Sequence, residues 1–310
     1  MFTKTRAALP VALVLAGAGL AAALGRTQET QETQELGVDT QEVAGTVRML
    51  EGVGGFVGGN VAACVGPDGV LVVDSYVERN RGLLVEAVTA LDAGEVRLAV
   101  NTHWHGDHAG NNAWFREVGA EVAAHENAIR RLAGDPTVEG RKAESPDAAA
   151  VPGLSIETRL VYRINGERVV LEHVGPGHTD GDVLVWFMDS KVLHMGDCFF
   201  KDRFPFIDLA SGGSPTGILA TVEHALDRLD GTWKVIPGHG SLATREDLAR
   251  YGEMLDVALG RVREGLDDGQ AFEDMREVGI LDDLAEDWGG GFIDKDAMLS
   301  SLVTGLRRGR

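Results

Sequence analysis

Residues 103 to 108 read His-Trp-His-Gly-Asp-His and place four potential ligands of a transition metal within six positions. The apolar, partly β-branched run from 96 to 100 precedes them and predicts a strand. Side chains two residues apart in a strand point to the same side, so His103 and His105 can bind one ion. The aspartate and the last histidine follow where the chain turns and can face a second ion. The segment therefore predicts a site for two metal ions. Imidazole and carboxylate ligands suit zinc best, with iron, manganese or cobalt as possible substitutes, so zinc is the default expectation.

Three further strand-like runs each lead into a glycine-containing turn that carries a potential metal ligand. Glycine lets the backbone turn sharply and approach an ion closely, and functional groups collect on loops held by a rigid sheet. The ligands after these runs are His178, the adjacent pair Asp197 and Cys198, and His239. They are the candidates that would complete the site.

The combined pattern resembles the metallo-β-lactamase superfamily, which has a His-x-His-x-Asp-His motif, a downstream histidine, an acidic or cysteine ligand and a final histidine. The resemblance covers residues 46–245. It implies a four-layer αββα sandwich, with two sheets inside and helices outside, and two zinc ions per chain. The implied ligands are His103, His105 and His178 for the first ion, Asp107, His108 and His239 for the second, and Asp197 as a bridge between them.

The resemblance also implies roles for residues around the ions. Asp107 would orient the attacking hydroxide, which makes it the candidate catalytic residue. Asp74 ends the apolar run 70–73 and matches an early aspartate that supports the metal loop through hydrogen bonds. Thr179 and Asp182 either support the metal ligands in the same way or hold their own loop.

The adjacent residues Asp197 and Cys198 leave one ligand open. Hydrolases of the glyoxalase II type carry Gly-Asp followed by a residue that binds no metal, whereas the cysteine-bearing β-lactamases carry Gly-Gly-Cys. With His108 present the second ion does not need a thiolate, so we favour Asp197 and expect Cys198 to pack beside the metals. Lys201 occupies the position of a lysine that binds the β-lactam carboxylate, or it is an ordinary solvated lysine.

Two features near the ligands could contact a substrate or serve the fold alone. The aromatic residues could line an apolar pocket or belong to the core: they are Trp104, Phe199, Phe200, Phe204 and Phe206. The turn at 211–214 could offer backbone N–H groups to an anion or merely begin the next helix.

Strands and helices alternate along the chain, as the αββα sandwich requires. We expect strands at 46–50, 56–64 and 70–74, and helices at 79–93, 112–118, 127–132 and 215–229. Residues 246–310 form a helical, acidic extension beyond the family domain, which would serve packing or a dimer contact. The sequence leaves the oligomeric state open.

The N-terminal segment predicts an exported protein, either periplasmic or secreted. Lys4 and Arg6 precede an apolar stretch, so residues 1–25 are interpreted as a signal peptide, with no stable membrane insertion after its cleavage. Residues 26–45 are polar and acidic and predict a disordered linker. The two cysteines, Cys64 and Cys198, are expected to stay reduced.

The charge balance bears on the substrate. With 48 acidic and 29 basic residues the formal net charge is −19, which disfavours nucleic acid and favours a small molecule. Zinc lowers the pKa of a bound water to about 7 and polarises a carbonyl group. We therefore expect a zinc hydrolase of an ester, lactone, thioester or amide. A true β-lactamase is the main alternative, and a redox or non-catalytic binding role on the same fold is a weaker one.

Overall fold

A computed structural model describes residues 35–144 and 146–308. In this part of the chain the strands form two mixed sheets. The first sheet has seven strands in the order β1 (Gly37–Ala44), β2 (Val47–Val53), β3 (Val61–Gly66), β4 (Gly69–Val73), β5 (Val96–Val100), β6 (Glu121–His125) and β7 (Leu154–Ile156). The second has six, in the order β13 (Ala243–Thr244), β12 (Lys234–Ile236), β11 (Val192–His194), β10 (Leu184–Phe187), β9 (Glu167–Glu172) and β8 (Arg159–Ile164).

The two sheets pack face to face through the alternate side chains of their strands. Leu71 and Val73 of β4 lie in the core between the sheets, together with Val169 and Leu171 of β9. Their neighbours on β4 point to the opposite face, because successive side chains of a strand alternate. Each sheet therefore has a buried inner face and an outer face that needs a cover of helices.

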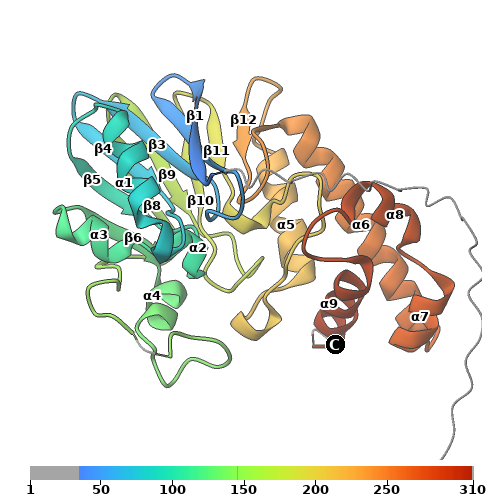
Figure 1. Cartoon of the computed structure of the whole chain (residues 1–310). Helices are drawn as coiled ribbons and strands as arrows, with labels where there is room; N and C mark the ends of the chain where they lie inside the picture. The colour runs from blue at the N-terminus through green and yellow to red at the C-terminus, as the bar shows by residue number, and fades with distance from the viewer. Residues whose placement is uncertain (1–34, 145, 309–310) are drawn as a thin grey trace, which may run out of the picture. The chain divides into compact units, whose positions relative to one another are not determined.

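Helices cover both outer faces, which gives the αββα order of layers (Figure 1). The first sheet is covered by α1 (Arg81–Ala90) and α3 (Asn112–Glu117), with α4 (Glu126–Leu132) beside β6 and β7. The second sheet is covered by α5 (Pro215–Leu226) and α6 (Arg245–Asp267). Their apolar side chains, such as Val222 and Leu255, share one core with the outer face of the sheet.

The C-terminal helices continue this core. After α6 come α7 (Phe272–Val278), α8 (Asp282–Trp288) and α9 (Lys295–Arg308), as Figure 1 shows in orange to red. Met275 of α7, Trp288 of α8 and Leu302 of α9 are buried in the same cluster as the helices that cover the second sheet. The predicted extension at 246–310 is thus helical, but it is not a separate packing unit.

The predicted disordered linker at 26–45 is wrong for residues 37–44, which form strand β1. This edge strand pairs antiparallel with β2, and half of its side chains are exposed. Backbone hydrogen bonds hold it, so its sequence can stay polar and shows little apolar periodicity. Residues 26–34 and the predicted signal peptide lie outside the described residues. Within the described range no helix has the length and apolarity needed to cross a membrane.

The topology brings the ligand-bearing loops together. Strands β4 and β5 are parallel neighbours, so their carboxyl ends lie on the same side of the first sheet. Asp74 follows one of these ends, and the motif at 103–108 follows the other. In the second sheet β11 and β12 are also parallel neighbours, and they lead to Asp197 and His239. His178 comes from the loop between β9 and β10. A short helix, α2 (Gly106–Ala109), carries Asp107 and His108.

Candidate metal centre

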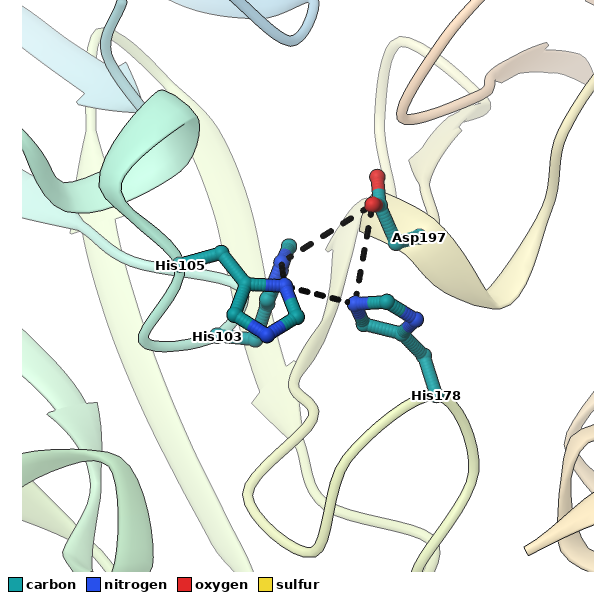
Figure 2. Close-up of side chains that lie close together, drawn as sticks. All are labelled: His103, His105, His178 and Asp197. Carbon is teal, nitrogen blue, oxygen red and sulfur yellow. Dashed lines mark hydrogen bonds and ion pairs between the residues drawn. The ribbon is translucent and has the colours of Figure 1, made fainter. Parts of the chain in front are cut away.

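The first group of facing ligands consists of His103, His105, His178 and Asp197. Figure 2 shows these four side chains directed toward one point. His105 Nδ1 lies 3.1 Å from His103 Nε2 and 2.9 Å from His178 Nε2. Asp197 Oδ2 lies 3.9 Å from His103 Nε2 and 3.6 Å from His178 Nε2. Three ring nitrogens and one carboxylate oxygen therefore surround a single position.

The second group consists of Asp107, His108 and His239. Asp107 Oδ2 lies 3.6 Å from His108 Nε2 and 3.3 Å from His239 Nε2. The other oxygen of Asp197, Oδ1, lies 3.1 Å from His108 Nε2 and 3.6 Å from His239 Nε2. Asp197 thus presents one oxygen to each group. The structure brings together all seven of the predicted ligands in the arrangement expected for a bridged pair of ions.

Both groups fit a divalent metal ion. Tetrahedral zinc with bonds of about 2.0–2.1 Å holds its ligand atoms about 3.3 Å apart, which is close to most of these separations. Two facing atoms, His108 Nε2 and Asp197 Oδ1, are buried, and although they lie 3.1 Å apart neither makes a hydrogen bond to a described residue. A buried polar atom without a partner is costly, and a cation between these two would satisfy both.

At three of the ligands, burial or neighbouring charges favour the protonation state that binds a metal. Together with the neighbouring histidines, burial holds the pKa of His103 well below its usual value, and burial lowers the pKa of His178 to about 4. Both imidazoles are therefore neutral at physiological pH, the form that binds a metal. Burial would by itself raise the pKa of Asp197, but His108 and His239 hold it well below its usual value.

Hydrogen bonds to the ring nitrogens that face away from the metal positions fix the orientation of two histidines, His108 and His178. Asp74 Oδ2 lies 2.8 Å from His108 Nδ1, and Thr102 donates to the same carboxylate through its N–H and its hydroxyl. His178 Nδ1 lies 2.7 Å from the carbonyl oxygen of Phe206. In each case the other ring nitrogen faces a metal position, the usual arrangement around protein metal sites. Asp74 has the supporting position that the resemblance implies.

His105 is oriented by Asp208, which sequence reasoning missed. Asp208 Oδ2 lies 2.8 Å from His105 Nε2 and accepts a hydrogen bond from the hydroxyl of Ser211. The N–H groups of Ser211 and Gly213 donate to the backbone oxygen of Asp208, and Ser214 caps α5. Of the two alternatives for the turn at 211–214, the structure supports the start of a helix, and the turn also holds Asp208.

Cys198 points away from both groups of ligands. Its Sγ lies 3.4 Å from Asp182 Oδ2, and its side chain is fully buried in the core. Burial, with Asp182 nearby, raises the pKa of the thiol well above its usual value, so it stays protonated. Asp182 also accepts hydrogen bonds from the N–H and the hydroxyl of Thr179. These hydrogen bonds stabilise the loop below the metal ligands and involve Thr179, Asp182 and Cys198. Of the adjacent pair, Asp197 is the residue that faces the metal positions.

Lys201 fits neither of its two expected roles, a substrate-binding residue or an ordinary solvated lysine, because its side chain does not line the cavity and is mostly buried. Its ammonium donates to the carbonyl of Leu242 at 3.0 Å and lies 3.6 Å from Asp247 Oδ2. Asp247 and Thr244 form the capping box that begins α6. Lys201 therefore ties the start of this helix to the segment that follows Asp197.

A cavity of about 710 Å³ opens above the two groups of ligands. The lining includes residues that the sequence did not mark as site residues, among them Phe56, Arg141, Arg203 and Phe292. Of the aromatic candidates Phe206 lines the cavity, whereas Phe199, Phe200 and Phe204 are buried in the core. The guanidinium of Arg141 lies over the ring of Trp104, 5.8 Å from its centroid. Phe56, Arg141, Arg203 and Phe292 lie in loops that contain no recognisable motif, so no local sequence pattern identifies them as site residues.

Fold and site together define an αββα sandwich protein in which histidine and aspartate side chains suited to divalent metal ions gather at the ends of the strands. The chain belongs to the metallo-beta-lactamase superfamily, since the model of that family matches residues 54–239. The match contains all seven facing ligands and ends before the C-terminal helices.

Individual relatives differ in their named activities. The chain is 33% identical over 102 residues to metallo-beta-lactamase IND-1 of Chryseobacterium indologenes, covering 33% of this chain and 37% of that protein. It is 30% identical over 154 residues to a hydroxyacylglutathione hydrolase of Anaeromyxobacter dehalogenans, covering 49% of this chain and 51% of that one. The chain therefore spans well under two thirds of these two relatives.

A solved structure supports the fold. The metallo-beta-lactamase from Pontibacter korlensis superposes with a TM-score of 0.58 at 20% identity, covering 71% of this chain and 99% of that one. Identity this low shows the shared αββα architecture and leaves the substrate open.

Proposed function

We propose that this protein is a binuclear zinc hydrolase that attacks the carbonyl group of a small ester, lactone, thioester or amide. The observation that carries the proposal is Asp197, whose two oxygens face two separate groups of ligands at 3.1 to 3.9 Å. A single ion could bind only one of the two groups of ligands, whereas two ions satisfy all seven residues.

The bound ions would supply a nucleophilic water at neutral pH and polarise the substrate carbonyl. The protein positions the reactants around them. Asp107 lines the cavity, and its carboxylate lies between His108 and His239. From there it can accept a hydrogen bond from the attacking water and hold it in line with the substrate, the role we assign to it.

The cavity suits a small molecule better than a polymer. Its volume of about 710 Å³ lies in the range typical of small-molecule sites. Phe56, Phe206 and Phe292 provide apolar walls beside the metal ligands. The net charge of −19 opposes the binding of a polyanion such as nucleic acid.

The first experiment measures metal content by elemental mass spectrometry and hydrolysis of ester, lactone and thioester substrates on the same preparation. We expect about two zinc ions per chain in the wild type, and loss of both metal and activity in Asp197→Ala. Asp256→Ala removes an equal charge from the exposed face of α6 and should change neither. A wild type that holds two zinc ions but hydrolyses none of these substrates would refute the proposed reaction.

A β-lactamase activity is the second candidate, favoured by the likeness to metallo-beta-lactamase IND-1. The structure weakens this reading, because Cys198 faces the core and Lys201 ties down α6. Hydrolysis of a chromogenic cephalosporin discriminates the two proposals. A kcat/KM for the cephalosporin that exceeds those for the ester and thioester substrates would favour the β-lactamase.

A further inference from the structure

The loop between α8 and α9 reaches the cavity, although it lies outside the family match at 54–239. Phe292 of this loop lines the cavity and is 65% exposed. Its ring centroid lies 6.2 Å from those of Phe206 and Phe200. The C-terminal helices therefore contribute a wall to the site in addition to completing the core.

A second exposed aromatic ring, Phe56, lines the same cavity from the loop between β2 and β3. Phe56 is 56% exposed and stacks on the metal-facing His239, with the ring centroids 6.2 Å apart. Two large exposed rings around one cavity make an apolar surface of the kind that marks a binding site. A substrate with an apolar group could cover both rings.

The same C-terminal loop positions Arg203 at the cavity. The N–H of Phe204 donates to the carbonyl of Trp288 at 2.8 Å, which joins the two segments. A Cβ atom at Gly291 would lie 3.0 Å from Cβ of Arg203, so a glycine there lets the arginine stem pack closely on the loop. Arg203 Nε donates to the carbonyl of Lys201 at 3.3 Å. The backbone and the loop thus hold the arginine side chain from two sides.

Arg203 forms no ion pair with any residue that the structure describes, although the chain carries 48 acidic residues. Arg203 still acts on Glu51, where burial and Asp39 raise the carboxyl pKa and Arg203 opposes them. Arg141, the other guanidinium on the cavity, lies 3.3 Å from Asp208 Oδ2 and is partly neutralised. The acidic residues that line the cavity are Glu78, Asp107 and Asp197, and the two aspartates face the histidine ligands. Arg203 is therefore the cation best able to accept a further anion.

We propose that Arg203 and Phe292 form a subsite, built by the C-terminal helices, for a substrate that carries both an apolar group and an anionic group such as a carboxylate. The inference rests on the proposed hydrolase function and specifies its substrate class. Phe292 and Phe56 hold the apolar group, and Arg203 binds the anion through charge-assisted hydrogen bonds. The reacting carbonyl then lies between this subsite and the metal ligands.

Binding of 2-phenylethanesulfonate to the zinc-loaded protein, measured by isothermal titration calorimetry, tests the subsite without any turnover. The probe has a ring and a fixed negative charge, and its sulfonate is a weak zinc ligand. Methyl 2-phenylethyl sulfone is the neutral comparison. We expect Arg203→Gln to weaken sulfonate binding at least tenfold, about 1.4 kcal/mol, and to leave sulfone binding unchanged. Phe292→Ala should weaken both probes.

Two controls match these changes elsewhere on the surface. Arg163→Gln removes the same charge from an exposed position on β8, and Val278→Ala removes an exposed apolar side chain from α7. Neither should alter binding of the probes. Equal sulfonate binding by the wild type and Arg203→Gln, or no binding by the wild type, would overturn the subsite. Metal content and ester hydrolysis test the proposed function separately, so the two failures are distinguishable.

Discussion

Two adjacent side chains, Asp197 and Cys198, take opposite roles because they lie in a single 3₁₀ turn after β11. The turn sends the carboxylate toward both groups of histidines and the thiol toward Asp182 in the core. A difference of one position thus decides which residue can bind metal. Without the turn geometry, the sequence favours Asp197 only through the presence of His108.

Cys198→Ser should retain the full metal content and most of the activity, because the thiol faces no metal position. A serine hydroxyl can keep the hydrogen bond to Asp182, so we expect only a small loss of stability, below about 1.5 kcal/mol. Elemental analysis and thermal unfolding check both expectations. Loss of one metal per chain in this variant would mean that sulfur is a ligand.

Asp208→Asn should weaken metal binding about 10- to 100-fold, the usual effect of removing a partner that orients a metal-binding histidine. The carboxylate lies 2.8 Å from His105 Nε2, and an amide in its place removes the negative charge behind the ring. Titration with a competing zinc chelator measures the change. Asp256→Asn on α6 is the matched control and should bind zinc as the wild type does.

The motif residues could be predicted because their identity and spacing are local, whereas their supporting partners could not. Asp74 was recognised because it ends an apolar strand, and the resemblance assigns it a role. Asp208 ends no such strand, and only folding of the chain brings it to His105. The contacts of Arg203 and Lys201 could not be predicted from the sequence either. The direction of a long side chain in a loop depends on contacts with distant segments.

At the scale of elements, two glycines allow loops to approach the ligands. A Cβ atom at Gly59 would lie 2.1 Å from the ring of His108, and one at Gly238 would lie 2.0 Å from Asp197 Oδ1. Both glycines precede or follow strands that meet at the site, Gly59 before β3 and Gly238 after β12. The loops can close around the ligands only because these positions carry no side chain.

Gly238→Ala should therefore displace Asp197 and lower metal content, even though it changes no ligand. Gly82→Ala on α1 is the control, because a Cβ atom there meets nothing within 4 Å. Alanine is also the better helix former, so the control should be as stable as the wild type or more so. Elemental analysis measures the zinc content per chain of both variants. Equal zinc content in Gly238→Ala and Gly82→Ala would show that the loop tolerates the added methyl group.

Most strands and helices of the family domain follow the apolar patterns of the sequence, and α5 begins at the predicted Pro215. The predicted strand at 56–64 is wrong for residues 56–60, because the chain there forms a loop whose Gly58 and Gly59 approach Tyr76 and His108, and β3 begins only at Val61. The strand β1 was missed because an edge strand needs backbone partners more than apolar side chains. The contribution of the α8–α9 loop to the cavity could not be predicted either. It depends on how the C-terminal helices pack on the second sheet, which their own sequence does not reveal.

At the scale of the whole described chain, helices α6 to α9 and the second sheet share one hydrophobic core. Removing the C-terminal helices would expose that sheet face together with α5. The region beyond 245 is thus part of the folding unit that carries the ligands.

Leu302→Ala tests this integration. Leu302 of α9 is fully buried, so its truncation should destabilise the protein by about 2–5 kcal/mol. Unfolding by denaturant is followed in two ways, by circular dichroism and by the release of zinc. Because the helices share the core of the ligand-bearing sheet, both midpoints should shift to lower denaturant concentration by the same amount. Val257→Ala, at an exposed position of α6, should leave both transitions in place. Zinc release unchanged in Leu302→Ala would show that the helices unfold independently.

The position of Cys198 has a further consequence for chemical resistance. The atoms that face the two metal positions are nitrogen and oxygen, and the thiol beside them is buried and protonated. Peroxides and alkylating reagents attack exposed thiolates far faster than buried thiols. A centre of this composition should thus keep its ions under oxidants that dismantle thiolate-ligated sites.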